Sequence, residues 1–372
     1  MKKDKLHCYA FWKPGENIVN TWSGTSWNLY QGLKSGFDTV IEDADRGIPA
    51  RGLLKLWKRN IICPRLWERL YYGWLNRRLK QHVGNDRVLM ISEVLETRNE
   101  HYCYFDNIWA TEYYFRRIEP QLGYRGWPLA HNIFKYASER QLRWNISRQY
   151  RIMASAKAVF CMGRWLKDFI DETYPELADH TYHVGGGINT PPPTRENGSV
   201  DRERPYRRIL FVGTDFALKG GDLLVEAYHI LKQRMPGVRL TMVGVDEKPQ
   251  CVTDDIEFCG RVKFEEVGRL MRSSDLFCLP TRFDAYCIAV IEALANGLPV
   301  VTRNVFELPS FVEEGVTGEF ITNDDAEYLA LQMEKVLNNP SYKEAVVARH
   351  DRYISEYSWE TVCRRMIDIM NK

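Results

Sequence analysis

The second half of the chain alternates short apolar runs with segments of helical spacing. Strands are expected at RRILFVG, VRLTMVGV, DLFCLP and LPVVT, and helices at GGDLLVEAYHILKQRM, FEEVGRLMRSSD and YCIAVIEALANG. The runs are short and rich in β-branched residues, as in strands that are buried on both faces. Repetition of strand and helix predicts a parallel sheet with helices on both faces, which is an α/β fold.

The first half shows the same alternation less regularly, with strands expected at LHCYAFW, FDTVIED, RVLMISEV, HYCYFDNI and KAVFCMG. Between the halves, glycines, prolines and charged residues follow neither period and indicate a linker. We expect an N-terminal domain at 1–190, a linker at 191–207, a C-terminal domain at 208–350 and a terminal helix at 351–372 that crosses back to the first domain. Two such domains predict a ligand cleft outside the carboxyl ends of the strands.

The length of the chain fits this two-domain interpretation, because 372 residues exceed the usual size of one domain. The N-terminus has lysines but no apolar core after them, so no signal peptide is expected. No apolar run reaches the length of a membrane span. The nine cysteines form no CxxC pair, which favours reduced thiols and a cytoplasmic location.

Charge is uneven along the chain: residues 1–190 carry 28 Lys and Arg against 20 Asp and Glu, and the remainder carries 23 against 29. Residues 51–82 concentrate the basic excess, with Glu68 as the single acid. Apolar residues recur there at helical spacing, namely Trp67, Leu70, Tyr71, Trp74, Leu75 and Leu79. The segment is either an amphipathic helix packed on the first domain or a helix that rests on anionic lipid as a peripheral contact on the inner face of the cytoplasmic membrane. A nucleic-acid surface is disfavoured because no binding module is recognisable.

Two acids interrupt the apolar stretch RFDAYCIAVIEALANGLPVV at 282–301. If a helix begins near Ala285, Asp284 lies at or beside its N-cap, where a carboxylate is favourable. Glu292 then lies roughly 12 Å farther along the axis, about the span of a nucleotide diphosphate sugar. The alternative is a simple cap and a buried acid that is paired within the protein, since an unpaired acid in this run is costly.

A second candidate site is ILFVGTDFALKGGDLLVEA, residues 209–227. A strand is expected to end at Gly213 and a helix to begin near Gly220 and Gly221, directly after Lys219. Open N–H groups at a helix N-terminus attract anions, and a lysine adds a positive charge. The alternative is an ordinary connection with a solvated lysine. The stretch is not a Walker loop, because GxxxxGK[ST] is absent.

Together these motifs resemble a known family. Residues 209–323 are similar to the C-terminal domain of retaining GT-B glycosyltransferases of family 4, whose E-G-F-G and E-A-hydrophobic-A-x-G-x-P-V correspond to Asp284-A-Y-C and Glu292-A-L-A-N-G-L-P-V. VGTDFALKG also looks like the V-G-S-D-F-x-x-K-G of lipopolysaccharide core glucosyltransferases. The resemblance implies a GT-B fold, two Rossmann-like domains facing across a cleft, and activity that needs no metal and no cofactor.

The resemblance also implies roles for individual residues. Glu292 would bind the ribose hydroxyls, Asp284 the hydroxyls of the donor sugar, and Lys219 the diphosphate as it leaves. Other implied donor contacts are Gly213, Thr214, Gly244, Arg261, Val262, Tyr286, Cys287 and Ile288. Arg261 and Val262 would lie at the base, and the amides at 286–288 would face the phosphates.

Three positions depart from the family pattern. Asp284 replaces a glutamate, Cys287 replaces a glycine, and Thr214 stands where a basic residue is usual. These changes keep a second hypothesis open, a GT-B-like protein that binds a nucleotide sugar or a partner with weak or no turnover.

The N-terminal half resembles the family in outline only. Ser23, Gly24 and Thr25 are candidates for the loop beside the donor phosphates, the alternative being N-capping by Ser23 or Thr25. Asp106 follows an expected strand and is the candidate that orients the acceptor hydroxyl or accepts its proton, the alternative being a turn aspartate.

The sequence therefore predicts a retaining glycosyltransferase that uses a UDP- or GDP-linked sugar. The expected acceptor is a glycan, glycolipid or lipid-linked hydroxyl in cell-surface polysaccharide or lipopolysaccharide synthesis.

Overall fold

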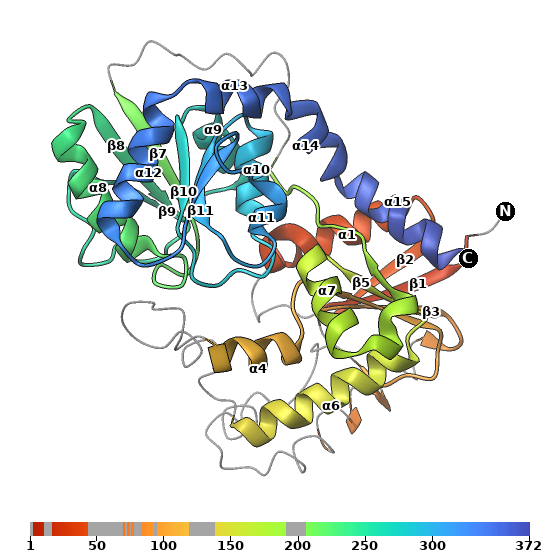
Figure 1. Ribbon diagram of the computed structural model, residues 1–372. Coiled ribbons are helices and arrows are strands. Elements are labelled where there is room, and N and C mark those ends of the chain that lie inside the picture. Colours follow the sequence, from red (N-terminus) through yellow and green to blue (C-terminus); the bar gives the residue numbers. More distant parts are fainter. Residues whose placement is uncertain are drawn as a thin grey trace. The chain divides into compact units, whose positions relative to one another are not determined.

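The computed structural model describes residues 3–10, 17–43, 70, 73–74, 76–77, 83–92, 95–118, 138–190 and 206–372. The chain divides into two compact units (Figure 1). Unit 1 comprises Met1–Glu119, Ala130–Gly187 and Trp359–Lys372, and unit 2 comprises Pro120–Leu129 and Ile188–Ser358. Most of the predicted linker, 191–205, lies outside the described residues.

Unit 1 is built on a parallel sheet of six strands in the order β2-β1-β3-β4-β5-β6. The strands are β1 (Lys5–Ala10), β2 (Asp38–Asp43), β3 (Arg87–Ile91), β4 (His101–Phe105), β5 (Ala158–Cys161) and β6 (Thr181–His183). The helices are η1 (Ile18–Gly24), α1 (Thr25–Leu33), α4 (Trp109–Ile118), α6 (Glu139–Ser155), α7 (Arg164–Thr173), η3 (Pro175–His180) and α15 (Trp359–Met370). Every residue of β4 and β5 is buried, as the unbroken apolar runs predict.

Unit 2 repeats this plan, with the strand order β12-β11-β10-β7-β8-β9. Its strands are β7 (Arg207–Val212), β8 (Val238–Val243), β9 (Glu257–Gly260), β10 (Leu276–Leu279), β11 (Val300–Arg303) and β12 (Gly318–Ile321). Its helices are α8 (Gly221–Arg234), α9 (Phe264–Arg272), α10 (Ile288–Ala295), α11 (Leu308–Phe311), α12 (Ala326–Asn338), α13 (Ser341–Ala348) and α14 (His350–Glu356). The strand order reverses between β7 and β10, the position where such sheets bind ligands.

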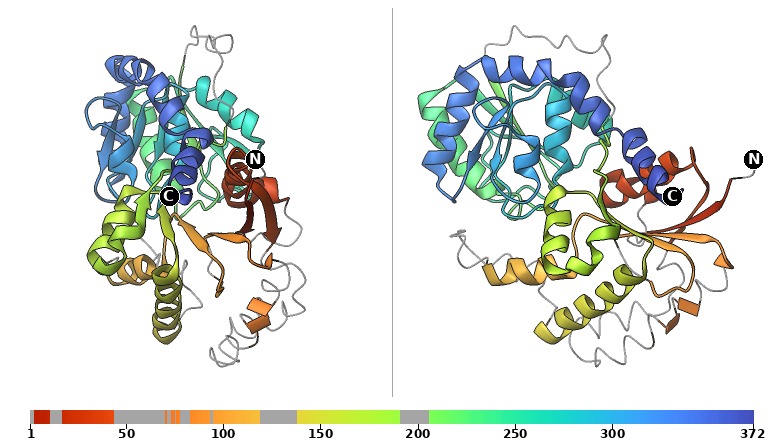
Figure 2. Two further views of the ribbon diagram at one scale, coloured as in Figure 1. Left: turned by 90° about the vertical axis from the view of Figure 1, so that its right-hand side faces the viewer. Right: turned by 45° about the vertical axis from the view of Figure 1, so that its right-hand side comes forward.

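The C-terminal helix α15 belongs to unit 1, whereas α14 belongs to unit 2. In both views of Figure 2, α15 lies beside α1. The thiol of Cys363 lies 3.6 Å from the carbonyl oxygen of Leu29, and a Cβ added to Gly32 would lie 2.4 Å from that sulfur. Glycine at 32 therefore allows the two helices to pack closely.

The strands predicted in the second half of the sequence are confirmed in type and position, and so are the helices α8 and α9. Helix α10 begins later than expected, at Ile288, and the single helix expected at 351–372 is two helices, α14 and α15. Three strands were missed: β6, β9 and β12. All three lie at sheet edges and contain only three or four residues. β6 and β9 are partly exposed and lack a clear apolar period. β12 is buried throughout, but its four residues, GEFI, are too few to show a period.

Of the basic segment 51–82, only residues 70, 73–74 and 76–77 are described. Trp74 is partly buried against the core of unit 1, while Leu70 is 53% exposed. Among the helices in the described ranges, none is long and apolar enough to cross a membrane. These observations leave both interpretations of the segment as predictions.

Candidate functional site

Two loops meet at the carboxyl edge of the unit 2 sheet. One follows β7 and leads into α8, and the other follows β10 and leads into α10. β7 and β10 are parallel neighbours, so their loops leave the sheet side by side. The loops are joined directly: the N–H of Arg282 donates to the carbonyl of Leu218 at 2.9 Å. A Cβ added to Gly220, which has φ +70°, would lie 2.3 Å from the carbonyl oxygen of Pro280.

Lys219 and Asp284, predicted as separate ligand contacts, form an ion pair across these loops. Nζ of Lys219 lies 2.5 Å from Oδ2 of Asp284, and their side chains are 16% and 21% exposed. The largest single influence on the pKa of Lys219 is burial, which lowers it. The negative charge and hydrogen bond of Asp284, with smaller contributions from Cys287 and Asp215, raise it by more, so the pKa lies above its usual value. The lysine is therefore charged, in a position partly shielded from water.

Asp284 is held from its other side by the backbone. Its Oδ1 accepts from the N–H of Cys287 at 2.8 Å and from the N–H of Tyr286 at 3.4 Å. The predicted start of the helix near Ala285 is wrong, because α10 begins at Ile288 and its N-cap is Cys287. Cys287 has φ +62°, in the left-handed region that favours glycine, and this turn delays the helix.

Glu292 is buried in α10 and binds the backbone of the segment that enters unit 2. Its Oε1 accepts from the N–H groups of Asn189 and Thr190, both at 2.8 Å. Burial raises the pKa of Glu292 to about 7, although both N–H groups act in the opposite direction. Of the two alternatives from the sequence, a buried acid paired within the protein describes this contact. Both hydrogen bonds use the same carboxylate oxygen, and binding of ribose hydroxyls by Glu292 stays a prediction.

The N-terminus of α8 differs from the predicted open anion site. The N–H of Gly220 donates to Ala217 at 3.1 Å, and the N–H of Gly221 donates to Phe216 at 2.8 Å. These two amides are used inside the loop, so Lys219 is its main positive group. A Cβ on Gly213 would lie 2.9 Å from Cγ of Lys219, so glycine leaves room for the lysine side chain.

The remaining unit 2 candidates lie along the same edge. A Cβ on Gly244, at φ +101°, would lie 2.6 Å from the carbonyl oxygen of Gly213, so the two backbones approach closely. Thr214 is exposed. Arg261 donates from Nη2 to Oδ2 of Asp246 at 3.0 Å, and Val262 beside it is partly buried. Their contacts with a base remain predictions.

In unit 1, residues 22–24 lie near the end of β4. The rings of Trp22 and Tyr104 are 6.1 Å apart, and Asp106 follows β4 directly. Gly24, at φ +89°, is the N-cap of α1 and makes no side-chain cap. Capping of α1 by Ser23 or Thr25 is therefore wrong, and Ser23 itself has φ +55°. Thr25 is buried, and Asp106 is partly buried.

Comparison with known proteins identifies the family of the segment that contains this edge of the sheet. Residues 195–353 match the family described as glycosyl transferases group 1. This segment belongs to that family. It contains both loops, the Lys219 and Asp284 pair, and Glu292.

The chain also has named relatives. A phosphatidyl-myo-inositol mannosyltransferase of Mycolicibacterium smegmatis is 26% identical over 174 residues, 45% of each chain. A D-inositol 3-phosphate glycosyltransferase of Corynebacterium urealyticum is 25% identical over 177 residues, 43% of this chain and 42% of that protein. The chain thus spans about half the length of the curated relatives it matches.

Solved structures resemble the whole chain. WaaG, a glycosyltransferase involved in lipopolysaccharide biosynthesis, gives a TM-score of 0.66 at 17% identity, covering 98% of this chain and 99% of that one. Anabaena Alr3699/HepE in complex with UDP-glucose gives 0.67 at 13% identity, covering 99% of both chains. At such identities the likeness shows the fold: the group 1 segment is part of a GT-B chain with two Rossmann-like units, as predicted.

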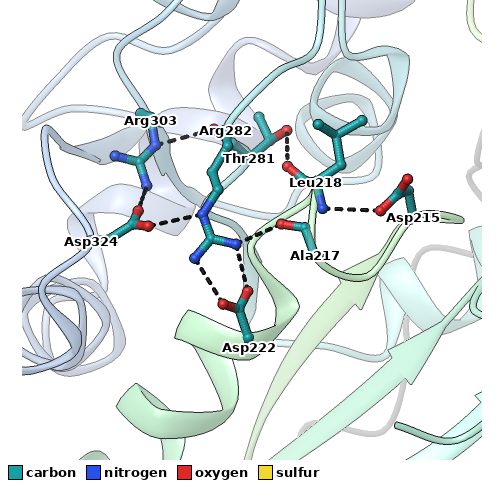
Figure 3. Close-up of polar contacts among 8 residues, drawn as sticks. All are labelled: Asp215, Ala217, Leu218, Asp222, Thr281, Arg282, Arg303 and Asp324. Carbon is teal, nitrogen blue, oxygen red and sulfur yellow. Dashed lines mark hydrogen bonds and ion pairs between the residues drawn. The ribbon is translucent and has the colours of Figure 1, made fainter. Parts of the chain in front are cut away.

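Sequence reasoning missed a charged cluster that supports both loops of the group 1 segment (Figure 3). It consists of Arg282, Arg303, Asp222 and Asp324, which come from the ends of four different elements. Arg282 follows a buried strand and lies two residues before Asp284. A charged residue directly after a buried strand needs a buried partner of opposite charge. The position of Arg282 in the sequence could therefore have indicated the cluster.

Proposed function

We propose that the chain is a glycosyltransferase that moves a sugar, with retention, from a UDP- or GDP-linked donor to a hydroxyl of a glycan, glycolipid or lipid-linked acceptor. The observation that carries this proposal is the Lys219 and Asp284 pair, held where two loops meet at the carboxyl edge of the group 1 segment. A cation there suits a departing diphosphate, and a carboxylate suits sugar hydroxyls.

The pair suggests how one binding event produces both contacts. A diphosphate competes with Asp284 for the ammonium of Lys219, because each is an anion. When Lys219 turns to the phosphates, Oδ2 of Asp284 becomes available to a sugar hydroxyl, while Oδ1 stays on the N–H of Cys287. Lys219 then stabilises the negative charge that develops on the leaving nucleotide. No metal ion or cofactor forms part of the proposal.

Unit 1 is the proposed acceptor domain, with Asp106 orienting the acceptor hydroxyl. A cavity of about 450 Å³ between α4 and α6 is lined by Tyr113, Arg116, Arg117, Glu139, Leu142 and Arg143. Three arginines and one glutamate line it, so its net charge is positive, and Arg143 pairs with Glu139 at 2.7 Å. The guanidinium groups of Arg117 and Arg143 lie 5.7 and 5.9 Å from the ring centre of Tyr113. We propose that the acceptor carries an anionic group, phosphate or carboxylate, that binds this cavity.

Names of relatives support the substrate class. One relative is named for transfer of mannose to phosphatidyl-myo-inositol, and one structural neighbour is described with UDP-glucose. WaaG is described as acting in lipopolysaccharide biosynthesis. We therefore place the reaction in the synthesis of cell-surface glycans or glycolipids.

The test is release of nucleotide from a panel of UDP- and GDP-sugars, with glycolipid and oligosaccharide acceptors. The expected result is release with one donor, formation of a product with the donor's anomeric configuration, and loss of release in Lys219→Met. Donor binding without any release across the panel would favour the second hypothesis, a nucleotide-sugar-binding protein without turnover. Absence of donor binding would refute both.

A further inference from the structure

The charged cluster beneath the two loops is nearly closed to water. The side chains of Arg282, Arg303 and Asp324 are 3%, 1% and 1% exposed, while Asp222 reaches the surface. Two arginines face two aspartates, so the charges balance. Buried charges are tolerated only when they are paired and hydrogen-bonded in this way, and loss of one partner is costly.

Arg282 uses its guanidinium group to join three separate pieces of chain (Figure 3). Nε donates to Oδ2 of Asp324 at 2.9 Å, in the segment before α12. Nη1 donates to the carbonyl of Ala217 at 2.6 Å, in the loop that carries Lys219. Nη1 and Nη2 together grip both oxygens of Asp222 at 2.7 and 2.9 Å, in the first turn of α8.

Arg303 binds both Asp324 and the backbone next to Arg282. Its Nε donates to the carbonyl of Thr281 at 3.2 Å, and Nη2 binds Oδ1 of Asp324 at 2.5 Å. Asp324 is thereby held by two arginines at once. The residues on either side of Arg282 are also fixed, since Thr281 donates to the carbonyl of Phe283 at 3.1 Å.

We propose that Arg282 is a positioning residue for the phosphate end of the donor. Ala217, which it binds, lies two residues before Lys219, and Arg282 itself lies two residues before Asp284. The guanidinium group therefore sets the distance between the cation and the carboxylate that form the site. The inference rests on the proposed function and adds a residue that touches neither phosphate nor sugar.

Lysine cannot replace arginine in this position. Its three donors leave from one nitrogen, whereas Arg282 donates from three nitrogens in a fixed plane to partners on different sides. Arg282→Lys keeps the charge but loses contacts, so the loop that carries Lys219 shifts. A displacement of this kind weakens an oriented contact by about tenfold or more.

The test measures affinity for inorganic pyrophosphate, UDP and GDP by titration calorimetry. Arg282→Lys is compared with wild type and with Arg349→Lys, a control whose arginine makes a two-point pair with Glu313 elsewhere in unit 2. The expected result is an about tenfold loss of pyrophosphate affinity in Arg282→Lys and no change in the control. Thermal unfolding followed by circular dichroism establishes that both variants are folded.

A double-mutant cycle separates positioning from general damage. If Arg282 acts through Lys219, Arg282→Lys changes pyrophosphate affinity by less than about twofold in a Lys219→Met background. The same factor in both backgrounds, or unchanged affinity in the folded single variant, overturns the inference. If Arg282→Lys does not fold, Asp222→Asn removes the partly exposed partner and is measured in the same cycle.

The outcomes distinguish the two proposals. Wild type that binds pyrophosphate with the expected coupling, but transfers no sugar, refutes the proposed function and leaves the positioning role intact. Sugar transfer together with additive effects of positions 282 and 219 refutes the positioning role alone. Wild type that binds no pyrophosphate refutes the inference directly.

Discussion

The buried carboxyl group of Glu292 makes the stability of unit 2 depend on pH. Burial raises its pKa from 4.5 to about 7 in the folded protein. The folded state therefore holds this proton more tightly than the unfolded chain does. The stabilisation is fully present below about pH 4.5 and is lost as pH rises through 7.

The size of the effect follows from the shift. One pKa unit corresponds to about 1.4 kcal/mol, so the contribution lost between pH 4.5 and pH 8 is about 3 kcal/mol. Glu292→Gln removes the titration but keeps an amide oxygen that accepts from Asn189 and Thr190. The free energy of unfolding of this variant, relative to wild type, should therefore rise by about 3 kcal/mol over the same range.

Urea unfolding at pH 5, 6, 7 and 8, followed by far-UV circular dichroism, measures this difference. Ten of the eleven tryptophans belong to unit 1 and only Trp127 belongs to unit 2, so tryptophan fluorescence would follow mainly unit 1. Glu265→Gln, at an exposed glutamate of the same unit, controls for the loss of one carboxylate. A stability difference between wild type and Glu292→Gln that stays constant from pH 5 to 8 would refute the reasoning.

Four further predictions address the rest of the molecule. Glu292→Ala should weaken free nucleotide and donor alike, whereas Asp284→Ala should chiefly lower turnover; equal losses of nucleotide affinity in calorimetry would contradict this division. Cys287→Gly relieves a left-handed residue but removes a buried thiol, so urea unfolding should show a change below about 1 kcal/mol, against a clear loss for Cys287→Val. Arg117→Gln with Arg143→Gln should raise the KM for an anionic acceptor and leave nucleotide affinity intact; a parallel rise for a neutral acceptor would argue against an anion cavity. Sedimentation with anionic vesicles should show salt-sensitive binding if residues 51–82 contact lipid, and none if they only pack on unit 1.

The central strands were predictable because their sequence pattern has one physical cause. A strand covered by helices on both faces is mostly apolar, as β5 and β10 are throughout and β4 is after His101. The edge strand β9 contains Glu257 and ends at Gly260, and no residue in it is fully buried. Pairing with β8 places it in the sheet, and such pairing leaves little trace in a four-residue segment.

The candidate site was predictable as a set of residues but not as a set of contacts. Lys219 and Asp284 stand out because each is a charge beside a glycine-rich or apolar stretch. Their ion pair joins positions 65 residues apart, and only the neighbouring arrangement of β7 and β10 brings them together. The partners of Glu292 are backbone N–H groups, which every residue except proline supplies, so no side-chain pattern could indicate them.

The late start of α10 shows how one residue reorganises the site. A helix beginning at Ala285 would leave Asp284 as a simple cap, with its carboxylate spent on the first turn. Because Cys287 adopts the left-handed conformation, the chain turns once more, and Oδ1 of Asp284 binds the N–H of Cys287 while Oδ2 meets Lys219. Each oxygen thus has its own partner, one fixed in the backbone and one on a flexible side chain. In the proposed function, only the second contact exchanges when the donor diphosphate binds, and the backbone N–H of Cys287 keeps the carboxylate of Asp284 in place.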